Sequence, residues 1–184
     1  MLIHIPDSDI INTKLSLISD NKVPSSFVTN SGQAYEWIWL PSSDVKQLLI
    51  MRNAEHVLSN MRNTSPITKE THLDFLQKYD SLQRVDFILQ NKESGLYVGG
   101  MNISLTSYGF EVGKYIGNAD YLGRGLAYPM SMSFIRFVKE NISEIIKIRA
   151  VTKLDNYKNI NLNFKLEFKI IQLVEENYWL MEIK

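Results

Sequence analysis

Residues 111–127, EVGKYIGNADYLGRGLA, constrain the fold most, because they join a strand pattern to a glycine loop and a helix start. Side chains alternate in character over residues 110–116, which predicts a strand with two distinct faces. Gly123-Arg124-Gly125 then removes side chains where the backbone could approach a ligand closely. From Leu126 the apolar spacing is helical. Unpaired amides at a helix start suit a phosphate or pyrophosphate, although an ordinary turn can carry the same glycines.

The remaining pattern predicts strands alternating with helices. Strands are expected at residues 34–40, 84–90, 96–105, 110–116, 145–151, 167–174 and 178–183. Helices are expected at residues 45–51, 57–61, 68–79, 126–140 and 155–166. Ser42-Ser43-Asp44, Thr68 and Asp155 are the expected helix caps. Short polar turns join the strands between residues 84 and 116, which predicts an antiparallel meander there.

A chain of 184 residues favours one domain, here residues 34–184, preceded by an arm of residues 1–33 with no assigned role. Lys plus Arg and Asp plus Glu both number 20, so the zero net charge indicates neither nucleic-acid binding nor a polybasic membrane surface. The absence of cysteine excludes disulfides, thiolate metal sites and a cysteine nucleophile.

The start of the chain, MLIHIPDSDIINTK, has no basic region followed by a long apolar core, so no secretory signal is expected. No apolar run reaches the roughly 20 residues that span a bilayer. We therefore expect a soluble cytoplasmic protein. The three histidines, at positions 4, 56 and 72, have no HExxH-like spacing, so no bound metal is expected.

Several motifs occur in a fixed order: Glu111-Val112-Gly113, Tyr115-Ile116-Gly117, Gly123-Arg124-Gly125-Leu126-Ala127, Asn156 and Lys165-Leu166-Glu167-Phe168. With the order of strands and helices, they resemble the GCN5-related N-acetyltransferase (GNAT) superfamily over roughly residues 35–183. The resemblance implies the GNAT fold, an α/β (α+β) architecture. Its central mixed, mostly antiparallel sheet has about seven strands, is splayed between the fourth and fifth, and carries flanking helices.

The resemblance also implies acetyl-CoA as co-substrate, with its pyrophosphate held by the amides of residues 122–127. Such amides beside a helix dipole do suit an anion. The implied coenzyme-binding residues are Tyr115, Ile116, Gly117, Leu122, Gly123, Arg124, Gly125, Leu126, Ala127, Asn156 and Asn159. For the two asparagines, a plain helix cap is the alternative role.

The implied reaction is direct transfer of acetyl from the thioester to a primary amine. An ammonium has no lone pair, so a base must first remove a proton, and Glu111 is the candidate. The alternative is that Glu111 is an ordinary exposed strand carboxylate. A backbone N–H near Ile116 would meet the negative charge that develops on the thioester oxygen.

The chain departs from the family pattern most clearly at two positions, with milder departures at Ala119 and Asp120. Asn163 occupies the place where many members carry a tyrosine that protonates the leaving thiolate, and asparagine is no comparable acid. Tyr157 is the candidate substitute, with a packing role as the alternative. Glu167 replaces the family's glycine, which implies that the backbone there need not adopt a conformation reserved for glycine.

The acceptor is predicted from a narrower resemblance. Arg52, Asn53, Met61 and His72 are similar to acceptor-pocket residues of amino-sugar N-acetyltransferases of the flagellin-glycan (pseudaminic acid) type. This implies the amine of a nucleotide-linked amino sugar as substrate and leaves a homodimer open. The alternative role is core packing for Met61 and that of a satisfied interfacial histidine for His72. A protein N-terminus, as in ribosomal-protein acetyltransferases, is the second candidate acceptor, and a free amino acid or polyamine the third. A non-catalytic acyl-CoA-binding module is the competing class.

Overall fold

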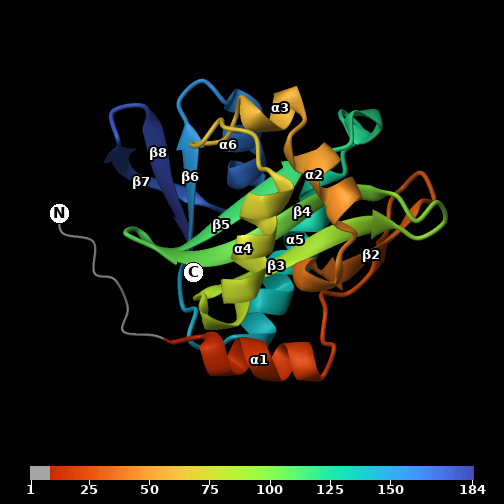
Figure 1. The fold of residues 1–184 in the computed structure, drawn as a ribbon. Coiled ribbons are helices and arrows are strands. Elements are labelled where there is room, and N and C mark those ends of the chain that lie inside the picture. Colours follow the sequence, from red (N-terminus) through yellow and green to blue (C-terminus); the bar gives the residue numbers. More distant parts are fainter. Residues whose placement is uncertain (1–8) are drawn as a thin grey trace.

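The computed structural model describes residues 9–184 and builds them around one mixed sheet (Figure 1). Its strands are β1 (Phe27–Val28), β2 (Ala34–Trp39), β3 (Arg84–Asn91), β4 (Tyr97–Thr106), β5 (Gly109–Ile116), β6 (Ile148–Lys153), β7 (Lys169–Val174) and β8 (Tyr178–Ile183). The helices are α1 (Ile11–Ser19), α2 (Val45–Arg52), α3 (Glu55–Leu58), α4 (Lys69–Lys78), α5 (Ala127–Asn141) and α6 (Tyr157–Lys165). Short 3-10 turns lie at Leu40–Ser42, Tyr79–Ser81 and Ala119–Tyr121.

The strand order in space is β1-β2-β3-β4-β5-β6-β8-β7, and every neighbouring pair is antiparallel except β5 and β6. The predicted meander therefore corresponds to β3, β4 and β5. The described residues form eight strands where about seven were expected, because the two-residue β1 pairs with β2 from within the N-terminal arm.

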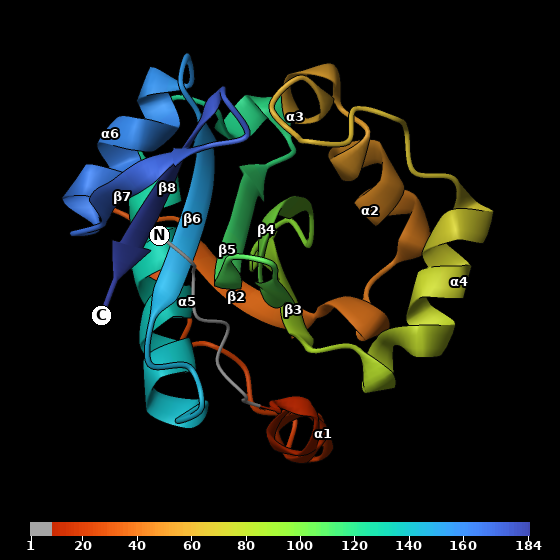
Figure 2. The same cartoon turned by 90° about the vertical axis from the view of Figure 1, so that its left-hand side faces the viewer.

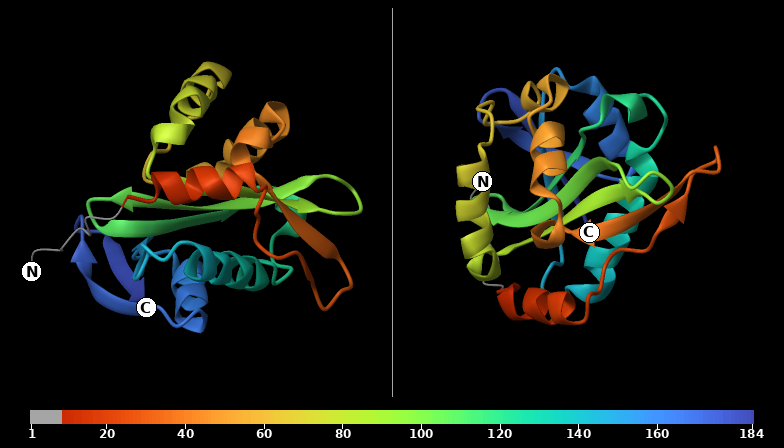
Figure 3. Two further views of the ribbon diagram at one scale, coloured as in Figure 1. Left: turned by 90° about the horizontal axis from the view of Figure 1, so that it is seen from below. Right: turned by 45° about the vertical axis from the view of Figure 1, so that its right-hand side comes forward.

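Helices cover both faces of the sheet (Figures 2 and 3). Helices α5 and α6 lie on one face, and α1, α2 and α4 lie on the other. The main core includes the aromatic side chains of Trp37, Phe87, Phe134 and Phe137, which pack edge-on or tilted against one another between the sheet and α5. A smaller cluster packs α2 against the other face and comprises Leu48, Met51, Ile88 and Tyr97. Each face of the sheet therefore has its own apolar contact layer.

Strands β5 and β6 diverge as the GNAT fold predicts. They share a single register pair, Glu111 with Arg149, whereas β4 pairs with β5 continuously from Gly99 to Thr106. Beyond Glu111 the edge of β5 that faces β6 is free of strand pairing. The splay between the fourth and fifth strands of the predicted set is thus confirmed.

Side-chain caps begin three of the helices. The Asp44 carboxylate accepts from Gln47 N at 2.7 Å, and Thr68 Oγ1 accepts from Thr71 N at 3.1 Å, as the sequence predicts. Helix α6 is different, because Asn156 Oδ1 is the acceptor, from Asn159 N at 3.1 Å. The expected cap at Asp155 is therefore one residue early.

Part of the N-terminal arm is attached to the body; residues 1–8 lie outside the described residues. Lys14 of α1 is fully buried, and its Nζ donates to the carbonyls of Tyr79 and Leu82 at 2.5 and 2.6 Å. Burial lowers the pKa of this ammonium. These bonds join α1 to the turn that precedes β3.

The expectation for Glu167 is wrong. Its φ is +67°, in the left-handed region that favours glycine. At this point α6 ends in a Schellman arrangement, with Phe168 N donating to Asn163 O and Glu167 N donating to Phe164 O. The hydrogen bonds fix the backbone conformation whatever the side chain, so glutamate occupies a glycine-type position. They also explain why β7 begins at residue 169 and not at 167.

Candidate active site

A cleft of about 870 Å³ follows the gap between β5 and β6. It extends from the glycine loop at the start of α5 to Glu111, and α6 forms part of its wall. Its lining includes Lys114, Tyr115, Ile116, Leu122, Gly125, Ala127, Thr152, Asn156, Asn159 and Leu162. The divergence of the strands therefore produces an elongated space with a helix start at one end and a carboxylate at the other.

The glycine loop offers unpaired amides. Gly123 and Gly125 both have φ of +73°, and a Cβ at either position would meet open space. Within residues 9–184, no hydrogen bond from the amides of residues 123–126 is present. Helix α5 also has no side-chain cap and no acidic residue in its first turn. Such an end fits a phosphate or pyrophosphate group, because the amides and the helix dipole both favour negative charge.

The cleft brings together most of the predicted coenzyme-binding residues but not all. Gly123, Arg124 and Leu126 are outside its lining: Leu126 is buried in the core, and the Arg124 guanidinium lies 5.5 Å from the Tyr121 ring centroid. Gly117 is also outside and has a packing role. A Cβ there would lie 1.7 Å from Met51 Cγ, so glycine permits the contact between the end of β5 and α2.

Asn156 and Asn159 both line the cleft while making structural hydrogen bonds. Asn156 caps α6 through its oxygen, and its amide donates to Asn60 Oδ1 at 3.0 Å. Asn159 Nδ2 donates to Thr152 Oγ1 at 3.0 Å. The cap that was the alternative role for Asn156 is therefore present, at a position that also faces the cleft.

The free edge of β5 presents backbone groups to the cleft. Gly117 N donates to Val98 O of β4, so by strand alternation the N–H groups of residues 112, 114 and 116 point toward the gap. His56 of α3 lies 2.9 Å from the carbonyl oxygen of Ile116 through its Nε2. The Ile116 amide is thus placed to donate to a group bound in the gap.

Glu111 is not an ordinary exposed carboxylate. Its side chain is only 15 % exposed, and Arg62 Nη2 donates to its two oxygens at 2.9 and 3.1 Å. Burial raises the pKa of Glu111, and the Arg62 charge and hydrogen bonds and the Thr106 hydroxyl oppose that rise. A desolvated carboxylate with a raised pKa beside a cleft has the properties of a general base.

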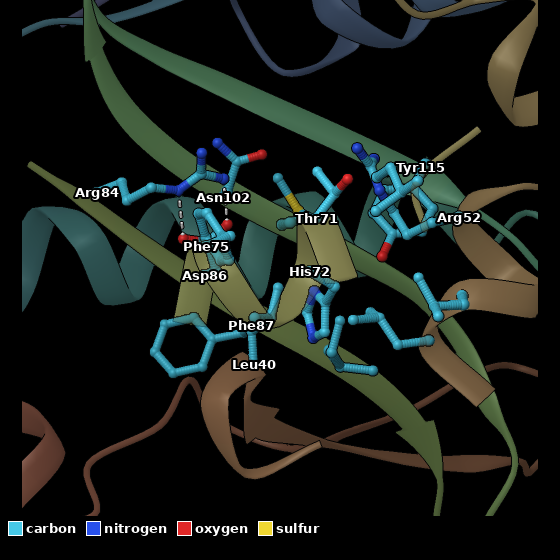
Figure 4. Close-up of a pocket in the computed structure, with 15 residues that line it drawn as sticks. Leu40, Arg52, Thr71, His72, Phe75, Arg84, Asp86, Phe87, Asn102 and Tyr115 are labelled. Carbon is cyan, nitrogen blue, oxygen red and sulfur yellow. Dashed lines mark hydrogen bonds and ion pairs between the residues drawn. The ribbon is translucent and has the colours of Figure 1, made fainter. Parts of the chain in front are cut away.

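A second cavity of about 230 Å³ lies on the α2–α4 face of the sheet (Figure 4). Thr71, His72 and Phe75 of α4 lie over the strands there, and the Arg84 guanidinium pairs with the Asp86 carboxylate. The cavity and the cleft share the side chains of Arg52, Arg84, Asn102 and Tyr115. The two spaces therefore adjoin at β4 and β5, and Glu111 lines only the cleft.

The predicted acceptor residues are distributed unevenly over these spaces. Arg52 lines both, with its guanidinium 4.7 Å from the Tyr115 ring centroid. His72 lines the smaller cavity, and burial lowers its pKa, so the imidazole is neutral at pH 7. Met61 lines only the cleft. Asn53 lines neither, because its amide exchanges two 2.8 Å hydrogen bonds with the Ile67 backbone and thereby holds the chain between α3 and α4.

Tyr157 and Asn163, the two positions considered for the acid, both lie outside the lining of the cleft. Tyr157 is 71 % exposed. Asn163 is fully buried, and its amide nitrogen donates to Thr152 Oγ1 at 3.1 Å. Its oxygen accepts a 2.6 Å hydrogen bond from Lys114 Nζ.

Sequence reasoning overlooked four residues of the site: His56, Arg62, Arg84 and Lys114. Of these four, only Lys114 could have been identified from the sequence pattern. It shares the apolar face of β5 with Phe110, Val112 and Ile116, where a lysine interrupts the pattern. The others reach the cleft or cavity from separate elements, so no local spacing marks them.

The described residues were also compared with what a metal site and a membrane-spanning helix require. In residues 9–184 no three His, Asp or Glu side chains gather as a metal would require. No described helix is both long and apolar enough to cross a bilayer.

Comparisons with known proteins identify the architecture through structure and not through sequence. No protein-family model and no curated protein matches the chain. A domain from Methanocaldococcus jannaschii aligns with a TM-score of 0.70 at 21 % identity, covering 82 % of this chain and 98 % of that domain. Spermidine N-acetyltransferase from Vibrio cholerae, solved with CoA and spermine, aligns with a TM-score of 0.68 at 16 % identity and coverages of 81 % and 94 %.

The N-acetyltransferase PseH of Campylobacter jejuni aligns with a TM-score of 0.61 at 16 % identity and coverages of 82 % and 97 %. The similar structures also include the GNAT domain of a Streptomyces lividans protein, with a TM-score of 0.67 at 13 % identity and coverages of 87 % and 96 %. Together with the splayed β5–β6 pair, these likenesses show that the chain has the GNAT fold.

Proposed function

We propose that the protein is an acetyl-CoA-dependent N-acetyltransferase that transfers acetyl to a primary amine. The observation that carries this proposal is the continuous cleft that joins the unpaired amides of the glycine loop to Glu111. An acyl-CoA needs an anion site for its pyrophosphate and a strand edge for its amide-bearing arm. The loop and the free edge of β5 supply these in that order.

In the proposed reaction, Glu111 takes a proton from the acceptor ammonium, directly or through water, and the neutral amine attacks the thioester carbonyl. The burial that raises the pKa of Glu111 makes it a stronger base than an exposed carboxylate. The Ile116 amide, on the free edge of β5, is the proposed donor to the oxygen on which negative charge develops.

The proposed acceptor is the amino group of a nucleotide-linked amino sugar. Charge supports this choice over a polyamine, because Arg52, Arg62 and Arg84 all line the cleft. Arg62 and Arg84 pair with carboxylates, whereas none lies within salt-bridge distance of Arg52 in residues 9–184. An excess cation at the acceptor side favours a phosphate-bearing molecule and disfavours a polycation.

Size supports the same choice. A cavity of about 230 Å³ is smaller than the several hundred Å³ typical of drug-sized ligands, which suits one sugar ring. Phe75 and Tyr115 supply apolar rings, and His72 and Asn102 supply polar groups for hydroxyls. A nucleotide attached to that sugar would extend into the larger cleft past Arg52. A protein N-terminus stays the second candidate acceptor.

An acetyl-transfer screen tests the proposal. UDP- and dTDP-linked amino sugars should release CoA with acetyl-CoA as donor, and the Glu111→Gln variant should lose this activity at low and neutral pH. Faster turnover of N-terminal peptides would show that a protein N-terminus, and not an amino sugar, is the acceptor. The spermine and kanamycin of two similar structures are useful comparison amines. Binding of acetyl-CoA with no turnover on any amine would indicate a non-catalytic acyl-CoA-binding module, and no CoA binding at millimolar ligand would refute the proposal entirely.

A further inference from the structure

Lys114 crosses from β5 to α6 at the splay between β5 and β6. Its Nζ donates to Asn163 Oδ1 at 2.6 Å, and both Lys114 and Thr152 line the cleft. Asn163 is held in turn by Thr152, whose hydroxyl oxygen accepts from the amides of both Asn159 and Asn163. A network of neutral side chains from β6 and α6 therefore fixes one ammonium beside the gap.

Strand alternation places this ammonium opposite the proposed base. Glu111 and Lys114 are three residues apart on β5, so their side chains project from opposite faces of the sheet. Glu111 projects from the face of the sheet that carries α2 and α4, where Arg62 contacts it, and Lys114 projects toward α6. A thioester bound in the gap would have the incoming amine on the side of Glu111 and the departing sulfur within reach of Lys114.

We propose that Lys114 is the catalytic acid that protonates the leaving thiolate of CoA, and that Asn163 is the residue that positions it. This inference rests on the proposed acetyl transfer. As the amine nitrogen forms its bond to the carbonyl carbon, the carbon–sulfur bond breaks and sulfur takes the electron pair. The attacking nitrogen, whose first proton Glu111 has already taken, loses its second proton to water as the amide forms. Lys114 gives one proton to the sulfur, yielding free thiol and a neutral lysine that regains a proton from solvent.

Electrostatics suits the role. Burial lowers the pKa of Lys114 to about 8, with no charged neighbour contributing. An ammonium in this range is mostly protonated at pH 7 and gives up its proton more readily than an ordinary lysine. Its hydrogen-bond partner Asn163, and Thr152, which holds Asn163, do not titrate. The other titratable groups that line the cleft are Arg52, His56, Arg62, Arg84, Glu111, Tyr115, Tyr128, Lys153, Lys158, Lys165 and Tyr178.

The first test measures the thiol of bound CoA and needs no turnover. Titration of the thiolate absorbance should show a lower thiol pKa for CoA bound to the wild type than for free CoA. CoA bound to Lys114→Met should lack that shift. CoA bound to Lys139→Met should retain it, because Lys139 is exposed in the last turn of α5, at the end away from the glycine loop. Equal thiol pKa values in the wild type and Lys114→Met would overturn the proposal.

The second test uses single-turnover acetyl transfer. Lys114→Met should slow the chemical step by about 10²- to 10⁴-fold while leaving the Kd for acetyl-CoA within a few-fold, and the limb of kcat/KM near pH 8 should vanish. Lys114→Arg keeps the charge but cannot donate a proton at these pH values, so it should be nearly as slow. The double variant Lys114→Met with Asn163→Tyr should recover at least tenfold, because a phenol then enters the same space.

These experiments distinguish failure of the acid role of Lys114 from failure of the proposed acetyl transfer. Retention of the wild-type rate by Lys114→Met, or full activity of Lys114→Arg, would overturn the acid role and leave acetyl transfer standing. If wild-type protein binds CoA but acetylates no amine, the proposed function fails, and the thiol titration still decides whether Lys114 contacts the sulfur. If Lys114→Met does not fold, Lys114→Arg and Asn163→Ala are compared with the wild type instead. A bound-thiol pKa and a transfer rate in Asn163→Ala that both equal those of the wild type would refute the positioning role.

Discussion

The contact between Arg62 and Glu111 sets the pH at which the proposed base becomes active. Arg62 lies between α3 and α4 and bonds both oxygens of Glu111, while its Nε is 3.9 Å from the Glu175 carboxylate. Replacing it as Arg62→Gln removes the positive charge and leaves Glu111 facing Glu175, Tyr108 and Thr106. Since the charge of Arg62 lowers the pKa of Glu111, the substitution should raise it.

The magnitude follows from the geometry. Arg62 is 39 % exposed, so the water-like dielectric limit is appropriate for the pair. At the 2.9 Å separation between Arg62 Nη2 and Glu111 Oε1, Coulomb's law in water gives about 1.4 kcal/mol, which corresponds to about one pKa unit. The side chain of Glu111 is itself largely buried, so the true shift should not be smaller.

The assay is the pH dependence of kcat/KM for acetyl transfer. A base with a higher pKa is protonated at a higher pH, so the acidic limb for Arg62→Gln should move up by about one unit. Arg62→Lys should move it less, and Arg136→Gln, an exposed arginine on α5, should leave it in place. An acidic limb that is unchanged in Arg62→Gln, or that moves down, would refute Glu111 as the titrating base.

Three substitutions test the structural arguments by thermal unfolding. Gly117→Ala should cost about 1–3 kcal/mol, because its Cβ would lie 2.7 Å from the backbone oxygen of Met51, which cannot rotate away; an unchanged Tm contradicts this. Glu167→Gly should stabilise by about 0.5–1 kcal/mol, since relief of the left-handed φ outweighs the added entropy of the unfolded chain. A lower Tm would exclude that account. Lys14→Met should destabilise by about 2 kcal/mol by leaving two carbonyls without their charged donor, and stability equal to the wild type would show that water replaces the donor.

Local pattern was sufficient for the elements that create the cleft. The two-residue period of β5 and the helical spacing after Leu126 are properties of short segments, and the glycines between them require positive φ. The splay was expected from the family resemblance, because no local feature of residues 110–116 or 145–151 states which strands will diverge. It became visible only through the single register pair between β5 and β6.

Local pattern failed where distant segments decide the outcome. Residue type at position 167 suggested a relaxed backbone, yet the hydrogen bonds that end α6 impose φ of +67° on the glutamate. The two-residue β1 has too little sequence to be recognised and exists through its pairing with β2. Arg62 lies 49 residues from Glu111 in the chain, so their ion pair could not be read from spacing.

The arrangement of Glu111 and Lys114 follows from the period of a strand. An odd separation on β5 puts one group on each face of the sheet, and the edge of β5 between them is not paired with β6 beyond Glu111. A base and an acid placed this way act on different atoms of the same thioester without neutralising each other. Asn163, which cannot donate a proton as a tyrosine would, then has a distinct use: its short side chain leaves room for the ammonium of Lys114, and its oxygen holds it.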